Sequence, residues 1–126
     1  MSGRVVHFEI PYDDAERASA FYGDVFGWNV QHMPELSYHI VSTGPATDQG
    51  MPSEPGYIGG GMAERRAPLD RPVITIDVDD VDDALERVRA NGGSQIGEKI
   101  PVGEMGVAAY FSDSEGNVMG LWQSTG

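Results

Sequence analysis

Two stretches decide the fold of this chain: VVHFEIPYDDAERASAFYGDVFGWN at residues 5–29 and RPVITIDVDDVDDALERVRANGGSQ at residues 71–95. When the first is shifted by 66 positions, apolar, acidic and glycine residues of the two coincide. The matched pairs are Phe8–Ile74, Ile10–Ile76, Asp13–Asp79, Asp14–Asp80, Ala18–Ala84, Tyr22–Val88 and Gly27–Gly93. A second match, shifted by 60 positions, sets residues 55–60 on 115–120. Similar sequence in the same order predicts one supersecondary unit built twice.

Each copy predicts a strand followed by a helix. Residues 5–10 alternate as a strand does, with Phe8 and Ile10 on the face toward the helix. Either Asp13 or Asp14 then caps the helix, and Gly27 ends it. The core-facing stripe of this helix is Ala18, Phe21, Tyr22 and Val25. The second copy repeats the plan with a strand over 73–78, a cap at Asp79 or Asp80, and a stop at Gly92-Gly93.

Three shorter strands follow each helix. Their predicted ranges are 28–32, 38–42 and 57–62 in the first copy and 95–100, 107–112 and 118–123 in the second. Two units of strand, helix and three strands predict the α+β class, with each helix on one face of a sheet. Because neither half buries an adequate core alone, we expect one domain over residues 1–126. Module one then covers about 1–64 and module two about 71–126.

The composition narrows the class of partner. The chain of 126 residues has 40% hydrophobic and 22% charged residues, as ordinary soluble globular domains do. Its net charge of -12 disfavours nucleic acids and anionic membranes, which bind clustered lysine and arginine. The charge suits a cationic ligand, although it also serves plain solubility. Without a cysteine there is no disulfide or thiolate ligand, and without a membrane-length apolar run we expect a cytoplasmic protein.

Strand alternation also predicts a hollow on the sheet face away from the helices. His7 and Glu9 project there in the first copy, and Val73 and Thr75 in the second. Glycines beside large side chains favour a pocket with apolar walls and a few polar groups, although glycines can also serve only to bend strands. Tyr12 either gates the entrance or is a simple turn residue. The predicted ligand-binding residues are His7, Glu9, Tyr12, Gly60, Met62, Val73, Thr75, Gly120 and Trp122.

The repeated plan, with His7 in the first strand and FYGDVFGW after the first helix, resembles the vicinal oxygen chelate superfamily of glyoxalases, extradiol dioxygenases and bleomycin-resistance proteins. The segments VVHFEIPYDDAERASAFYGDVFGW, YIGGGM, IDVDDVDDALERVRANGG and YFSDSEGNVMGLWQ are similar to its uncharacterised glyoxalase-related branch. The resemblance covers almost the whole chain. It implies two βαβββ modules that form a cupped mixed sheet around a cavity, and it implies a homodimer.

The resemblance also implies where a divalent metal would bind. Metal enzymes of this superfamily use one residue in each first strand and a glutamate in each last strand. His7 falls on the first of these positions, but the others fall on Val73, Gly60 and Gly120, which cannot ligate. Since catalytic zinc generally needs three protein ligands, we expect a degenerate site without a cofactor, of which His7 is the remnant. The alternative is a metal held weakly by His7 and by Glu9, about 6.6 Å further along the strand.

Three functions follow from these observations. The favoured one is a metal-free protein that binds a small cationic or aromatic molecule, with Trp122 stacking against it. The alternative is a glyoxalase-like lyase, an isomerase or a dioxygenase-related enzyme, whose tentative catalytic residues are His7 and Glu9, acting through a metal or as acid and base. A third is a partner-binding module whose cavity is vestigial and filled by residues 43–56. The sequence identifies neither the ligand nor whether the cup forms within one chain or across a dimer.

Overall fold

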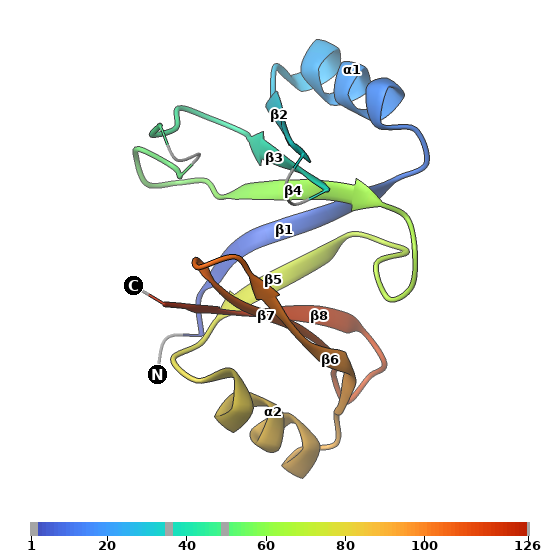
Figure 1. Ribbon diagram of the computed structural model, residues 1–126, viewed down its shortest axis with the longest axis vertical. Coiled ribbons are helices and arrows are strands. Elements are labelled where there is room, and N and C mark those ends of the chain that lie inside the picture. Colours follow the sequence, from blue (N-terminus) through green and yellow to red (C-terminus); the bar gives the residue numbers. More distant parts are fainter. Residues whose placement is uncertain (1–2, 35–36, 49–50, 126) are drawn as a thin grey trace. The chain divides into compact units, whose positions relative to one another are not determined.

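The computed structural model of the chain describes residues 3–34, 37–48 and 51–125. It divides into two compact units: residues 7–72, here the N-terminal unit, and residues 1–6 with 73–126, here the C-terminal unit. Within these residues, two helices and eight strands alternate as strand, helix and three strands, twice (Figure 1). The predicted α+β class and its two βαβββ modules are therefore confirmed, and strand bounds differ from the predicted ones by no more than two residues.

In the N-terminal unit the strand order is β2-β3-β4-β1. The elements are β1 (Val5–Tyr12), α1 (Ala15–Phe26), β2 (Asn29–Met33), β3 (Tyr38–Ser42) and β4 (Gly59–Glu64). β1 and β4 pair in parallel, whereas β2, β3 and β4 pair antiparallel, so the sheet is mixed. Of the two aspartates predicted as cap, Asp14 is the one used, and its carboxylate accepts a bond from the backbone N–H of Arg17. Gly27 ends α1 with φ 73°, a left-handed conformation that glycine adopts without strain.

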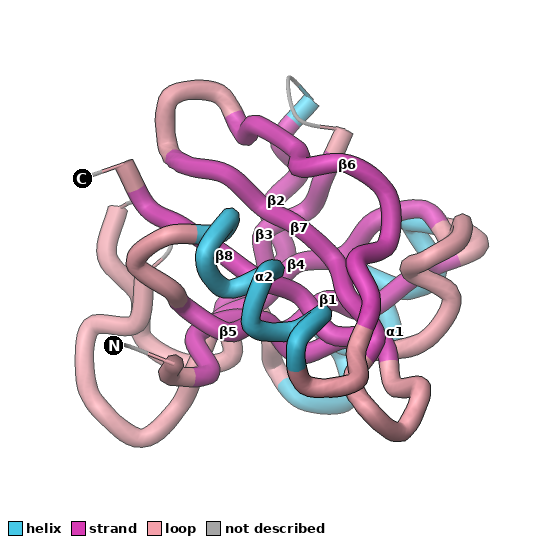
Figure 2. Tube along the Cα trace, turned by 90° about the horizontal axis from the view of Figure 1, so that it is seen from below, coloured by secondary structure: helices cyan, strands magenta, loops and turns pink. Residues whose placement is uncertain are grey.

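In the C-terminal unit the strand order is β5-β8-β7-β6. The elements are β5 (Val73–Asp77), α2 (Val81–Ala90), β6 (Ser94–Val102), β7 (Gly106–Ser112) and β8 (Val118–Ser124). β5 and β8 pair in parallel, as β1 and β4 do. Asp80 caps α2 by accepting two backbone N–H bonds. The core of this unit lies where α2 covers β6, β7 and β8 (Figure 2), and comprises Val81, Leu85, Ala109, Phe111 and Leu121.

The two helices differ in how much they bury. The predicted core stripe of α1 is wrong for Phe21 and Val25, which are both 55% exposed. Trp28, directly after the helix, stacks on Tyr22 with ring centroids 4.8 Å apart and also contacts Phe8 of β1 at 5.7 Å. The helix thus packs mainly through Tyr22 and the indole of Trp28. Within the described ranges, neither helix is both long enough and apolar enough to span a bilayer.

Candidate functional site

The side chains of β1 alternate between the two faces of the N-terminal sheet. Phe8 packs against Trp28 and therefore lies on the face of α1. His7 and Glu9 consequently project from the opposite face, as the sequence predicts. Both side chains are half-buried. The face opposite α1 therefore carries both candidate site residues of β1.

A tyrosine from β3 joins His7 and Glu9 into a hydrogen-bonded triad. The hydroxyl oxygen of Tyr38 lies 2.9 Å from Nε2 of His7, and the hydroxyl donates a bond of 2.8 Å to Oε2 of Glu9. The imidazole and phenol rings are nearly parallel, with an interplanar angle of 19° and centroids 6.3 Å apart. We call His7, Tyr38 and Glu9 the triad. The sequence analysis did not single out Tyr38.

Tyr38 reaches β1 by crossing over β4, which lies between β3 and β1. β3 and β1 are two strand spacings apart, about 9.6 Å, so the phenol must lie across β4 to reach from one to the other. Gly61 is the residue it crosses. A Cβ placed on Gly61 would lie only 2.0 Å from the Tyr38 hydroxyl oxygen and 2.1 Å from two ring carbons. The triad therefore depends on a missing side chain in the strand it spans.

The predicted face of Gly60 and Met62 is wrong. A Cβ on Gly60 would meet the ring of Phe8 at 2.5 Å, which places Gly60 on the face of α1. Met62, two residues further along β4, shares that face and is fully buried. In the parallel pairing, His7 lies opposite Gly59 and Glu9 opposite Gly61. The β4 residues on the face of the triad are therefore Gly59 and Gly61, and the Tyr38 ring covers Gly61.

Tyr12 also lies away from the triad. Its ring packs edge-to-face on His39, with centroids 5.5 Å apart, and His39 stacks on His32 at 4.5 Å. Alternation along β1 puts Tyr12, its last residue, on the face of Phe8, so Tyr12 does not line the face that carries the triad. Burial, and then the neighbouring His32, lower the pKa of His39. These two histidines form a separate pair on the helix face.

Electrostatics in the triad favour a neutral imidazole. Burial lowers the pKa of His7 below the ordinary 6.5, and the charge of Glu9 opposes this with a smaller upward effect. Desolvation disfavours the charged form of a base, which is why burial acts in this direction. His7 is thus uncharged near neutral pH, and its hydrogen-bonding capacity is that of a neutral imidazole: one donor and one acceptor.

The remaining predicted residues lie in the C-terminal unit and are considered there alone. Thr75 and Gly120 are opposite each other, and a Cβ on Gly120 would lie 2.8 Å from the Thr75 hydroxyl. Trp122 shares their face, away from α2, and its ring lies over Gly106. Val73, the counterpart of His7 in the repeat, is 2% exposed. This face thus presents a buried hydroxyl beside an indole.

A divalent ion of the kind used elsewhere in this fold does not fit these residues. Among residues 3–34, 37–48 and 51–125, no three His, Asp or Glu side chains converge as a metal site requires. Catalytic zinc is generally held by three protein ligands, and the positions across from His7 and Glu9 are glycines. The two side chains that could ligate are instead joined through Tyr38.

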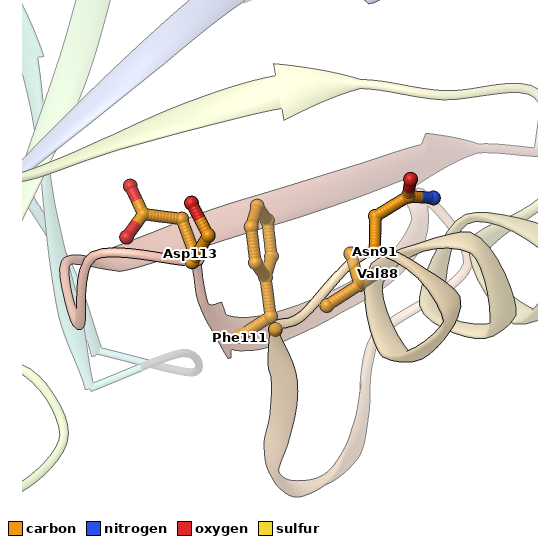
Figure 3. A pocket seen from close by; sticks show the side chains of 6 residues that line it. Val88, Asn91, Phe111 and Asp113 are labelled. Carbon is orange, nitrogen blue, oxygen red and sulfur yellow. The ribbon is translucent and has the colours of Figure 1, made fainter.

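One pocket of about 190 Å³ lies in the C-terminal unit, where α2 ends beside β7. In Figure 3 the ring of Phe111 stands between Asp113 on one side and Val88 and Asn91 on the other. The Asp113 carboxylate already accepts bonds from two backbone N–H groups and the amide of Asn117, which lower its pKa. None of the predicted site residues lines this pocket, and its only carboxylate is committed to the β7–β8 turn.

The sequence and the fold of this chain resemble those of known proteins. Residues 4–44 match the family model described as bleomycin resistance protein-like N-terminal. A glyoxylase-like domain-containing protein of Didymella fabae is 33% identical over 93% of this chain and 91% of its own length. The chain therefore belongs to the vicinal oxygen chelate superfamily, which confirms the resemblance seen in the sequence.

Within this superfamily the chain is similar to two further named relatives. A lactoylglutathione lyase of Salmonella typhimurium is 30% identical over 90% of this chain and 87% of the relative. A putative glyoxylase of Mycobacterium tuberculosis is 29% identical over 88% of the chain, which spans 42% of that longer protein.

Solved structures match the fold alone. A hypothetical protein from Bacillus halodurans aligns with a TM-score of 0.67 at 15% identity, covering 100% of this chain and 97% of its own. A methylmalonyl-CoA epimerase from Streptomyces coelicolor aligns with a TM-score of 0.64 at 18% identity, covering 100% of each chain.

Proposed function

We propose that this protein binds a small organic molecule without a metal, on the sheet face that carries His7, Tyr38 and Glu9. The observation that carries the proposal is the triad itself. Nε2 of His7 and Oε2 of Glu9 are both engaged by one tyrosine hydroxyl. Side chains held by each other in this way form a pre-organised polar surface, which favours recognition of an organic ligand.

Further support comes from the positions that hold a metal elsewhere in the superfamily. Val73 offers no donor atom, and the residues paired with Glu9 and Thr75 are Gly61 and Gly120. The degenerate chelate predicted from the sequence is thus consistent with the residues present in each unit. Bleomycin-resistance proteins, whose N-terminal family model matches this chain, motivate a binding role rather than metal catalysis.

The charge of the chain indicates the ligand. A net charge of -12 raises the local concentration of cations around the protein, and Glu9 adds a carboxylate at the site. A cationic ligand with an aromatic group suits this environment. Binding of a small molecule, whatever its charge, also has a precedent in this fold, because one solved neighbour is a methylmalonyl-CoA epimerase in complex with methylmalonyl-CoA.

A thermal-shift screen in the presence of EDTA tests the proposal. The panel pairs aromatic amines such as benzylamine with carboxylates of similar size such as benzoate. A ligand at 100 times its dissociation constant adds about 2.7 kcal/mol to the free energy of unfolding, so a true ligand raises the melting temperature by several degrees. Glu9→Gln should abolish the shift. Glu16→Gln, which removes the same charge from the first turn of α1, should keep it.

Two results would count against metal-free binding. One is a panel in which no amine and no carboxylate raises the melting temperature. The other is stabilisation that appears only after zinc, nickel or manganese is added, together with stoichiometric metal in the protein purified without an affinity tag.

A second function is favoured by one feature of the triad. A neutral imidazole backed by a tyrosine and a carboxylate has the composition of a general base, which would make the protein a metal-free lyase or isomerase. One relative, the lactoylglutathione lyase of Salmonella typhimurium, is by name a lyase. Deuterium uptake from D2O into a bound ligand, retained in EDTA and lost in His7→Ala, would establish it. A ligand that binds without exchange would leave binding as the function.

Two finer expectations belong to the same proposal. We expect a homodimer in the cytoplasm, as the superfamily resemblance and the composition suggest. Light scattering after size-exclusion chromatography measures the oligomeric state, and a mass near 13.6 kDa at all concentrations would contradict the dimer.

A further inference from the structure

We infer that Tyr38 is a positioning residue that keeps the proton of His7 on Nε2, so that the site presents the lone pair of Nδ1 to a ligand that donates a hydrogen bond. The tautomer follows from the contacts in the triad alone. The class of ligand, a donor such as an ammonium or amide N–H, rests in addition on the proposed binding function.

The proton of the Tyr38 hydroxyl fixes the first bond. A phenol carries a single proton, whereas an ionised carboxylate can only accept. The bond of 2.8 Å between Tyr38 and Oε2 of Glu9 therefore uses the tyrosine proton. Nothing is left on the hydroxyl to donate in another direction, so the phenol oxygen can only accept from its other neighbour.

That other neighbour is His7. Its Nε2 lies 2.9 Å from the Tyr38 oxygen, a normal distance for an N–H···O bond. Because the oxygen must accept, Nε2 must carry the proton. The small angle of 19° between the two rings lets the N–H bond, which lies in the imidazole plane, point along the edge of the phenol.

The remaining nitrogen then has a lone pair. A neutral imidazole holds one proton, so Nδ1 of His7 is an acceptor when Nε2 is the donor. Burial, which lowers the pKa of His7, supports the neutral form. Among the described residues no hydrogen bond to this Nδ1 is found, and the atom is not among the buried polar atoms that lack a partner. An acceptor placed beside a carboxylate on an acidic protein favours a cationic donor as the ligand.

Long-range 1H–15N NMR of uniformly 15N-labelled protein near pH 8 tests the tautomer. The wild-type protein should show a pyrrole-like Nε2 and a pyridine-like Nδ1 for His7. Tyr38→Phe keeps the ring over Gly61 and removes only the hydroxyl, so His7 should shift toward a mixture of tautomers. His32 and His39, on the opposite sheet face, are internal controls and should keep their spectra.

A second variant makes the test independent of the folding of Tyr38→Phe. Glu9→Ala removes the carboxylate that accepts the tyrosine proton, so the hydroxyl is free to donate to Nε2 of His7. The tautomer should then reverse, with the proton on Nδ1. A wild-type His7 that already carries its proton on Nδ1, or a tautomer that neither variant changes, would overturn the positioning role.

A pair of ligands of equal charge tests the donor requirement. Benzylammonium has three N–H donors, whereas trimethylbenzylammonium has the same charge and ring but none. Benzylammonium should move the His7 Nδ1 resonance and bind about tenfold more tightly, the effect of one hydrogen bond of about 1.4 kcal/mol. Equal affinities would overturn the donor requirement. If neither compound binds, the cationic ligand class is overturned. If no compound in the thermal-shift panel binds, the proposed function is overturned. The tautomer is measured without any ligand and does not depend on these results.

Discussion

The substitution Gly61→Ala is expected to break the triad without touching any of its members. The new methyl carbon would lie 2.0 Å from the Tyr38 hydroxyl oxygen and 2.1 Å from Cε2 and Cζ. Heavy atoms in contact lie about 3.5 Å apart, so the phenol must retreat by about 1.5 Å. The bonds of 2.9 Å to His7 and 2.8 Å to Glu9 cannot survive such a shift. The usual limit is about 3.2 Å for an N–H···O bond and about 3.0 Å for an O–H···O bond.

The energetic cost follows from the two bonds that are lost. A bond to a charged group contributes about 1.5–3 kcal/mol and a neutral one about 0.5–1.5 kcal/mol. Alanine in a strand recovers about 0.5–1 kcal/mol of the conformational entropy that glycine loses on folding. Because the triad is half-buried, we take the lower values and expect a net loss of about 1.5 kcal/mol.

A double-mutant cycle with Tyr38→Ala isolates this effect. In the wild-type background Gly61→Ala should lower the urea midpoint, whereas without the phenol ring the added methyl group meets no obstacle and should be neutral or mildly stabilising. The coupling energy is then about 2 kcal/mol. The effects of substitutions at independent sites usually add to within about 0.3–0.5 kcal/mol, so this coupling would be clearly measurable. Equal costs in both backgrounds would refute the idea that Gly61 acts by letting Tyr38 pass.

Three further measurements test other parts of the fold. Asp80→Ala removes a carboxylate that accepts two backbone N–H bonds, at 2.9 and 3.2 Å. It should lower the free energy of unfolding, measured in urea, by about 1 kcal/mol. The exposed control Asp83→Ala should lower it by less than about 0.5 kcal/mol. Gly23→Ala in α1 places a methyl group 3.6 Å from the nearest atom, a backbone oxygen, and should raise stability by about 0.5–1 kcal/mol; a loss would show hidden strain there. The folded pKa values of His7 and His39 lie below 6.5, so the unfolded chain binds protons first as the pH falls. The free energy of unfolding should be flat above about pH 7 and should fall from about pH 6.5 toward pH 5. His39→Gln should reduce the slope of this fall. A free energy of unfolding that rises as the pH falls would contradict the prediction.

The repeat in the sequence was sufficient to predict the elements and their order. Periodicity places strand and helix in each copy, and the caps Asp14 and Asp80 fall among the predicted alternatives. These features are local, because hydrogen bonds within one helical turn and side-chain alternation along one strand do not depend on distant residues.

The error at Gly60 is a one-residue slip in the internal alignment. Glu9 and Thr75 are equivalent in the repeat, and their strand partners are Gly61 and Gly120. The structural equivalent of Gly120 is therefore Gly61, although the sequence match pairs it with Gly60. A slip by one residue transfers every side chain to the other face of the strand. In the run Gly59–Gly61 no side chain marks which face is which.

The role of Tyr38 could not be predicted from local sequence patterns, for a different reason. Its role requires β3, β4 and β1 to be adjacent in that order, with a glycine at the crossing point. Only the pairing of strands distant in the sequence creates this arrangement. The available signal was a glycine run in the strand next to that of Tyr38, which has an equally good explanation in strand bending.

The phenol that spans β4 also affects how activity should be assigned among relatives. A comparison that checks only for histidine, glutamate and tyrosine would accept a homologue with alanine in the crossed strand, in which the same three groups could not meet. Conventional alanine scanning would overlook this position as well, because it trims large side chains and skips those that are already absent. Recognition of this arrangement in another chain thus requires four residues, and the fourth contributes only by leaving room.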